Sequence, residues 1–125
     1  MPEIKEALNL GDLLKYEASH LYSRERVTVV AGHNLPLGAV VGIVTASGKV
    51  KPLDPSATDG SQLAAGVLLQ PCDAALAERN DGLIVARHAI VADHALTWPT
   101  GITAGEKATA VLQLKALGVL VRHGV

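Results

Sequence analysis

The pattern of apolar and polar residues changes near residue 26. Residues 1–25 mix Glu, Lys, Ser and Tyr with isolated leucines, and they hold neither a period of 2 nor a period of 3.6 for long. We predict an N-terminal arm whose apolar side chains become ordered against a partner surface. The alternative is an amphipathic first helix packed on its own domain. The apolar residues concerned are Leu8, Leu10, Leu13, Leu14, Tyr16, Leu21 and Tyr22.

From residue 26 onward, short β-branched runs are separated by turn residues about every eight to twelve positions, which is typical of an all-β sandwich or barrel. The run Val40–Val44 hardly alternates, so we expect a central strand there. Arg87 and His88 stand inside the last long run, which predicts a bend or a sheet edge at that point. Strands are expected at 26–31, 39–45, 49–53, 64–69, 83–92 and 119–122, turns at 35–38 and 46–49, a polar loop at 54–61 and a short helical turn at 74–79.

One helix is predicted near the C-terminus. Thr103 and Glu106 have the spacing of a capping box, in which each side chain accepts a hydrogen bond from the other residue's backbone N–H. Gly118 is a natural end for this helix, and its apolar face is formed by Ala110, Val111, Leu114 and Leu117. Residues 26–125 are therefore predicted to form a β-rich core domain with one C-terminal helix.

Composition restricts the function classes. The chain has 125 residues, enough for one domain, and it contains no Phe, so Val, Leu, Ile and Ala must build its core. A formal net charge of -1 gives no electrostatic case for direct nucleic-acid binding. The lone Cys72 fits synthesis in a reducing cytoplasm. We also expect no signal peptide and no membrane segment, because no apolar run approaches the roughly 18 residues that a span needs.

Candidate chemistry is weak, and we predict neither an enzyme nor a cofactor or metal site. The segment Gly42–Lys49 resembles a P-loop, but five residues separate Gly42 from the Gly48-Lys49 pair where a P-loop has four. The next residue, Val50, has no side-chain oxygen to bind magnesium. The five histidines lack the spacing of zinc ligands. Cys72 has no neighbouring residue that would lower its pKa, so it is interpreted as a small hydrophobe or a free thiol.

Trp98-Pro99 is the remaining feature of interest. Trp98 is the only Trp, and Pro99 keeps it in extended backbone. We consider two roles for this pair. One is an anchor in or beside the core, and the other is an anchor of a subunit interface, where Trp is enriched.

Four segments, in order over nearly the whole chain, resemble the head decoration proteins of tailed phages, the family typified by that of phage lambda. None is diagnostic alone; the resemblance lies in their order. The segments are Leu10–Glu17, Leu35–Lys49, Asp59–Leu68 and Leu96-Thr97-Trp98-Pro99 followed by the predicted helix.

The resemblance implies a mainly β, β-clip-like small domain with one C-terminal helix and a flexible N-terminal arm. It further implies a homotrimer that binds the outside of the expanded head at three-fold positions and stabilises it against the pressure of packaged DNA. The implied partner is the major capsid protein, to which the arm at 1–25 adds as a strand. The expected location is the virion, after synthesis in the bacterial host cytoplasm. Within the arm, the candidate capsid-binding residues that we select from this sequence are Leu10, Leu13, Leu14 and Tyr16, and the candidate trimer-interface anchors are Trp98 and Pro99.

Two other functions stay open at this stage. One is a small ligand-binding protein or enzyme of the β-clip class, such as a dUTPase. That family places a tyrosine beside acidic residues in its uracil pocket, whereas Tyr16 and Tyr22 both fall in the predicted arm. The other is a bacterial or tail-associated assembly protein without a capsid partner.

Overall fold

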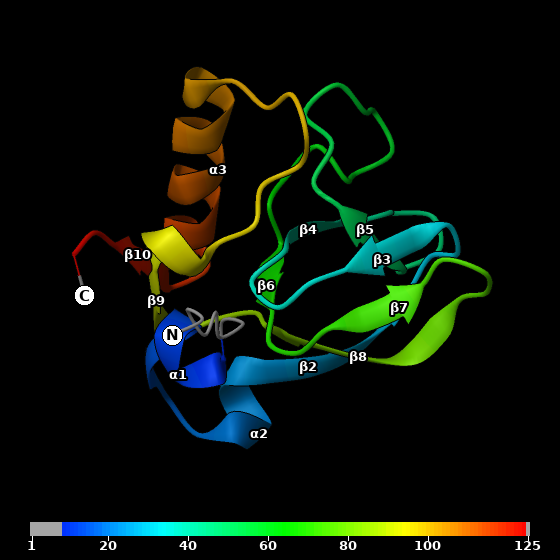
Figure 1. Cartoon of the computed structure of the whole chain (residues 1–125). Coiled ribbons are helices and arrows are strands. Elements are labelled where there is room, and N and C mark those ends of the chain that lie inside the picture. The colour runs from blue at the N-terminus through cyan, green and yellow to red at the C-terminus, as the bar shows by residue number, and fades with distance from the viewer. Residues whose placement is uncertain (1–8, 125) are drawn as a thin grey trace, which may run out of the picture.

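The computed structural model describes residues 9–124, and 37% of these are strand and 21% helix. The predicted mainly β class with one C-terminal helix is thus confirmed (Figure 1). The strands are β1 (Leu14–Glu17), β2 (Arg24–Val29), β3 (His33–Leu35), β4 (Val40–Ile43), β5 (Val50–Pro52), β6 (Gly66–Leu68), β7 (Cys72–Ala74), β8 (Arg79–Val85), β9 (Ala89–Ala92) and β10 (Val119–Arg122); the helices are α1 (Leu10–Leu13), α2 (His20–Ser23), the 3-10 turn η1 (Asp93–Ala95) and α3 (Ala104–Ala116).

A closed barrel forms the larger part of the domain, in the strand order β2-β5-β4-β6-β8. β4 pairs on one side with β5 and on the other with β6, and its first three residues are buried. This confirms the central position predicted from its unbroken apolar run. Closure of the barrel leaves these strands without a free edge that could pair with another chain.

A second sheet has the order β1-β9-β10 and lies beside α3 (Figure 1). β9 is its middle strand; it runs antiparallel to β1 and parallel to β10. The predicted long strand at 83–92 is wrong, because β8 ends at Val85 in the barrel and β9 starts at Ala89 in this sheet. The predicted bend is confirmed, since His88 between them has φ of 51°.

The C-terminal helix follows the sequence prediction closely. In α3 the Thr103 hydroxyl accepts a hydrogen bond from the Glu106 N–H at 3.1 Å, and the Glu106 carboxylate accepts one from the Thr103 N–H at 2.9 Å. Ala110 and Leu114 are buried against the domain, whereas Leu117 remains partly exposed. The capping box is therefore confirmed, whereas only Ala110 and Leu114 of the predicted apolar face are buried and Val111 is partly buried.

A third, two-stranded sheet was not predicted. β3 and β7 pair antiparallel from His33↔Ala74 to Leu35↔Cys72. The short helical turn expected at 74–79 is wrong, since the chain there bends and then enters β8 at Arg79. Strands this short carry too few residues to show a period of 2, which explains why the pattern missed them.

Two buried clusters hold the domain together. One fills the barrel and includes Val41, Leu68 and Ile84. The other lies between the second sheet, α3 and the barrel wall, and it includes Leu13 and Leu114. Leu13 is 0% exposed, so part of the segment expected to form a separate arm packs in this second cluster.

Gly48 closes the turn between β4 and β5 with φ of 72° and has open space around it. We expect Gly48→Ala to lower the free energy of unfolding by about 1 kcal/mol, because an alanine side chain strains the left-handed backbone. Urea denaturation measures this change. Ser47→Ala in the same exposed turn is the control and should be close to neutral; equal stability of all three proteins would contradict the argument.

Candidate functional site

The predicted arm residues divide between core and surface. Leu13 is fully buried, Leu10 and Leu14 pack partly buried against its cluster, and Tyr16 is 60% exposed on β1. In this structure residues 10–25 pack on the remainder of the domain through two four-residue helices and β1, which differs from the single amphipathic helix considered above, and the separate arm over 1–25 stays a prediction. The physical reason is the burial of Leu13 together with the pairing of β1 to β9. Residues 1–8 of the predicted arm lie outside the described residues.

Glu17, at the end of β1, organises the chain that follows it. Its side chain is 7% exposed and accepts hydrogen bonds from the Ser23 hydroxyl at 2.7 Å and from Arg24 Nε at 3.0 Å. His20 Nε2 lies 3.0 Å from the same carboxylate. The Arg24 guanidinium holds the pKa of the Glu17 carboxyl below its usual range, although burial acts in the opposite direction. Glu17 thus fixes α2 and the start of β2 to the end of β1.

The corner between β8 and β9 holds the same segment from the other side. The His88 carbonyl accepts a hydrogen bond from the Ala18 N–H at 3.0 Å, and the Ser23 carbonyl accepts one from the Ala86 N–H at 2.8 Å. The Tyr22 ring lies against the His88 ring, with 4.9 Å between centroids. These contacts join positions about 65 residues apart, so no local pattern could have revealed them.

Arg87 adds charged contacts at this corner. Its guanidinium carbon lies 5.5 Å from the centre of the Tyr22 ring, and the same group pairs with the Glu25 carboxylate and donates to the Tyr22 carbonyl. The positive charge of Arg87 is thereby compensated within the domain. The sequence placed Arg87 in the middle of a predicted strand and indicated a bend there. In the structure Arg87 lies at that bend, where the β8–β9 corner meets α2 and β2.

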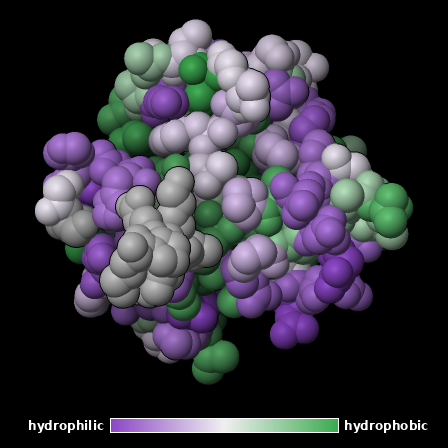
Figure 2. Space-filling view, viewed as in Figure 1, coloured by the Kyte–Doolittle hydropathy of each residue, from purple (hydrophilic) through white to green (hydrophobic). Residues whose placement is uncertain are grey.

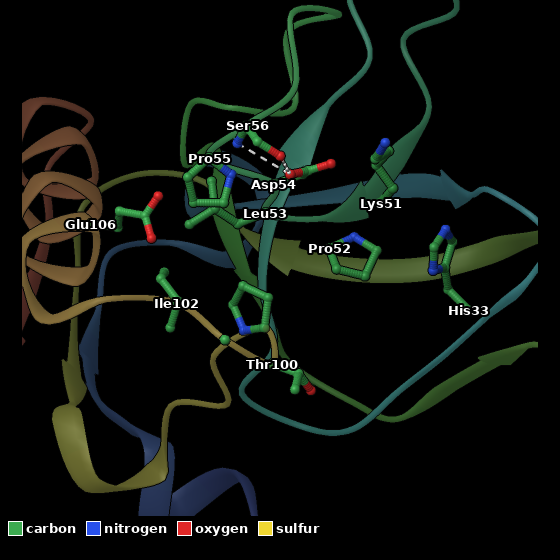
Figure 3. Close-up of a pocket in the computed structure, with 12 residues that line it drawn as sticks. His33, Lys51, Pro52, Leu53, Asp54, Pro55, Ser56, Thr100, Ile102 and Glu106 are labelled. Carbon is green, nitrogen blue, oxygen red and sulfur yellow. Dashed lines mark hydrogen bonds between the residues drawn. The ribbon is translucent and has the colours of Figure 1, made fainter.

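Trp98 and Pro99 occupy the wall between the barrel and α3. Trp98 is partly buried and packs against the cluster that contains Leu13, in agreement with the role of an anchor beside the core. Pro99 lines a cavity of about 480 Å³ with Pro52 and Ile102 (Figure 3). The involvement of Trp98 and Pro99 in a subunit interface stays a prediction.

The polar groups of this cavity bond to near neighbours in the chain. Asp54 accepts a hydrogen bond from the Ser56 hydroxyl at 2.8 Å, and Glu106 belongs to the cap of α3. His33 lies at the far end of the cavity from Ser56, beside Lys51 (Figure 3). Burial, and to a lesser degree the Lys51 charge, lowers the pKa of His33. Ser56 and His33 are therefore not placed as a nucleophile and its base.

The other chemical candidates are explained by local structure. Lys49, the lysine of the P-loop-like segment, pairs with Glu78 at 2.7 Å beside a tight turn. Cys72 is buried in β7, and this burial raises the pKa of its thiol, which disfavours the reactive thiolate. Within residues 9–124, no three His, Cys, Asp or Glu side chains gather as a metal site would require.

An apolar groove of about 820 Å³ was not foreseen. Figure 2 shows hydrophobic residues reaching one face of the molecule in separate places among hydrophilic ones. Three of the large hydrophobic residues with exposed side chains, Tyr22, Leu63 and Leu117, nevertheless line this one groove. We call it the Leu63 groove and define it by Tyr22, Ile43, Leu63, Ile84, Ala116 and Leu117.

The domain is small and mainly β and carries an apolar groove, and exposed apolar surface bounded by polar residues marks an interaction site. None of the helices among the described residues has the length and apolarity that a membrane crossing requires. The family model of the bacteriophage lambda head decoration protein D matches residues 3–119, and the chain belongs to this family. The protein is thus a phage head decoration protein that associates with the capsid of the virion. No curated protein matches the sequence significantly.

Proposed function

We propose that the protein binds the outside of the expanded phage head as a homotrimer at three-fold positions and stabilises the shell against the pressure of packaged DNA. The family match over residues 3–119 carries this proposal. The proposed partner is the major capsid protein, and the proposed place of synthesis is the cytoplasm of the bacterial host. The protein acts by binding and needs no cofactor.

The N-terminal part of the chain is the proposed attachment element. β1 stands at an edge of the β1-β9-β10 sheet, with Lys15 and Tyr16 exposed. An edge strand presents backbone N–H and C=O groups that can pair with another chain. Residues 1–8, which precede α1, extend the attachment element and add to a strand of the capsid protein, while the buried Leu13 secures its inner end.

Trimerisation is part of this mechanism. A single short segment buries little area and binds weakly, whereas three segments on one rigid trimer bind as a linked set. Linkage of this kind multiplies avidity by roughly 10² to 10⁴ without any new contact. Expansion of the head exposes the receptor strands, so that binding depends on capsid maturation.

Removal of residues 1–8 should abolish binding to expanded capsids and leave the fold intact. This boundary is better than a cut after residue 22, because the longer deletion would remove Leu13 and β1 from the folded domain. Full-length and truncated proteins are mixed with expanded, undecorated capsids and sedimented, and their oligomeric state is measured by analytical ultracentrifugation.

The full-length protein should sediment with expanded capsids and not with unexpanded ones. The truncated protein should remain trimeric and stay in the supernatant. Tyr16→Ser tests the exposed edge of β1 separately and should weaken binding without altering the trimer. Binding of the truncated trimer at full strength would remove the role assigned to residues 1–8, and equal binding to both kinds of shell would remove the dependence on expansion.

A further inference from the structure

Residues 10–23 lie at one edge of the molecule, and we call this segment the clasp (Figure 1). It consists of α1, β1 and α2, and each of these elements has four residues. Helices this short are unstable in water on their own, so the clasp depends on contacts with the remainder of the domain. Leu13 and Ser23 are its two buried residues, one toward each end. The clasp is therefore held at few points.

The rest of the domain keeps its strand pairing without the clasp. Only β1 of the clasp joins a sheet, and it pairs with β9 alone, through a register that shifts between Leu14 and Tyr16. β9 also has its parallel partner β10, and the closed barrel contains no strand of the clasp. Detaching the clasp breaks one edge pairing and withdraws Leu13 from its cluster. A segment with so few shared contacts can open at a lower free energy than the whole domain.

The Glu17 carboxylate is the contact that ties β1 to the barrel. It accepts hydrogen bonds from the Ser23 hydroxyl at 2.7 Å and from Arg24 Nε at 3.0 Å, and its side chain is 7% exposed. Arg24 is the first residue of β2, so this ion pair joins the clasp to a barrel strand. Loss of the carboxylate leaves the partly buried guanidinium without its charged partner, which is strongly unfavourable. The closed position of the clasp therefore depends on Glu17.

The β8–β9 corner makes the contacts of the clasp interdependent. His88 has φ of 51°, a left-handed backbone that an L-residue keeps only where surrounding contacts favour it. Two of those contacts come from the clasp. The His88 carbonyl accepts a hydrogen bond from the Ala18 N–H at 3.0 Å, and the Tyr22 ring lies 4.9 Å from the His88 ring. Opening of the clasp thus also removes support from the corner, which favours loss of these contacts together.

We propose that the clasp opens as one unit while the barrel stays folded, and that the Glu17 contact keeps it closed. The opening is a property of the domain, whereas its consequence for attachment rests on the proposed function. A closed clasp holds the attachment element close to the domain. An open clasp lengthens the connection by up to roughly 45 Å, which lowers the effective concentration of the linked segments. The Glu17 contact thereby raises the avidity of the trimer.

Native-state hydrogen exchange on the wild-type protein tests whether the clasp opens by itself. The hydrogen-bonded amides of Leu14, Ala18 and Ser23 should share one opening free energy at pH 7. This free energy and its urea dependence should both be smaller than those of β4 in the middle of the barrel, because a partial opening exposes less surface. NMR resolves the individual amides. Values equal to those of β4, or three different values within the clasp, would overturn the unit.

Glu17→Gln tests the contact that keeps the clasp closed. The same amides should exchange at least about tenfold faster without urea, because exchange reports the opening equilibrium and the variant destabilises the closed state. Glu25→Gln is the matched control, since it removes a neighbouring carboxylate and leaves the Glu17–Arg24 pair in place. It should change clasp exchange by less than about threefold. Unchanged exchange in Glu17→Gln would overturn the role of Glu17.

Attachment is measured separately on expanded capsids. Glu17→Gln should dissociate from them faster than the wild type and Glu25→Gln do. Equal dissociation of all three proteins, together with the expected exchange, would overturn the effect on avidity and leave the clasp standing. Failure of the wild type to bind expanded capsids would overturn the proposed function and not the clasp, because the exchange is measured without capsids.

Discussion

Replacing Leu13 with alanine is expected to lower the free energy of unfolding by about 3 kcal/mol. Leu13 is 0% exposed and shares its cluster with Val91, Ala95 and Leu114, so the substitution removes buried methyl groups and leaves a cavity. Chemical denaturation of the full-length chain measures the change. The same variant should lose capsid binding only in proportion to its unfolded fraction, because Leu13 faces the core and not a partner.

Tyr16→Ala is the control for this prediction. Tyr16 lies three residues away on β1 and is 60% exposed, so its truncation should cost well under 1 kcal/mol. A neutral Leu13→Ala combined with lost capsid binding would show that residues 10–14 leave the domain and serve as the separate arm predicted from their irregular pattern.

Glu17→Gln should lower the free energy of unfolding at pH 7 by about 2 kcal/mol. The 7% exposed carboxylate accepts hydrogen bonds from Ser23 and Arg24, and an amide in its place leaves the Arg24 charge without its partner. The wild-type contribution depends on pH because the folded state holds the pKa of Glu17 below its unfolded value of about 4.3. The contribution is complete above that unfolded pKa and is lost as the pH falls through the folded pKa.

Urea denaturation at pH 7 and at pH 3 measures both the loss of stability in Glu17→Gln and the pH dependence of the Glu17 contribution. The stability difference between wild type and Glu17→Gln should narrow at pH 3, because below the unfolded pKa of about 4.3 the unfolded wild-type chain binds a proton at Glu17 more readily than the folded chain does. Glu25→Gln is the control, since Glu25 pairs with Arg87 at a partly exposed site and should change stability by less than about 1 kcal/mol. An equal difference at both pH values would mean that the charge of Glu17 does not stabilise the fold.

Local signals account for what the sequence predicted correctly. The capping box at Thr103 and Glu106 lies within four residues, and the unbroken run in β4 reflects burial on both faces. Both features are properties of one short segment. The family resemblance was likewise readable, because it rests on ordered segments and not on any single contact.

Contacts between residues far apart in the chain account for the places where the structure differs from the sequence-based predictions. The run at 83–92 reads as one strand because Arg87 and His88 interrupt it only briefly, yet the chain changes sheet there. Irregular periodicity in residues 10–25 suggested an arm because two four-residue helices and a short strand produce no sustained period. Their packing depends on β9, which is more than 60 residues away in the chain.

The Leu63 groove likewise could not be predicted from the sequence, because it is formed by residues that lie far apart in the chain. Its lining comes from α2, the barrel, the loop that carries Leu63 and the end of α3. Each of these residues looks in the sequence like an ordinary core or surface position. Only their convergence identifies the groove, whereas the capsid-binding candidates could be named from one continuous stretch.

The position of β1 has a mechanical consequence. If the first residues are attached to the shell, tension from the expanded head under the pressure of packaged DNA enters the domain at α1 and passes directly into β1. That strand is secured at one end by the buried Leu13 and at the other by the hydrogen bonds of Glu17. The load then spreads to β9, the middle strand of its sheet, and through β10 to the C-terminal helix. For a segment attached in this way, resistance to force is set inside the domain, at Leu13 and Glu17.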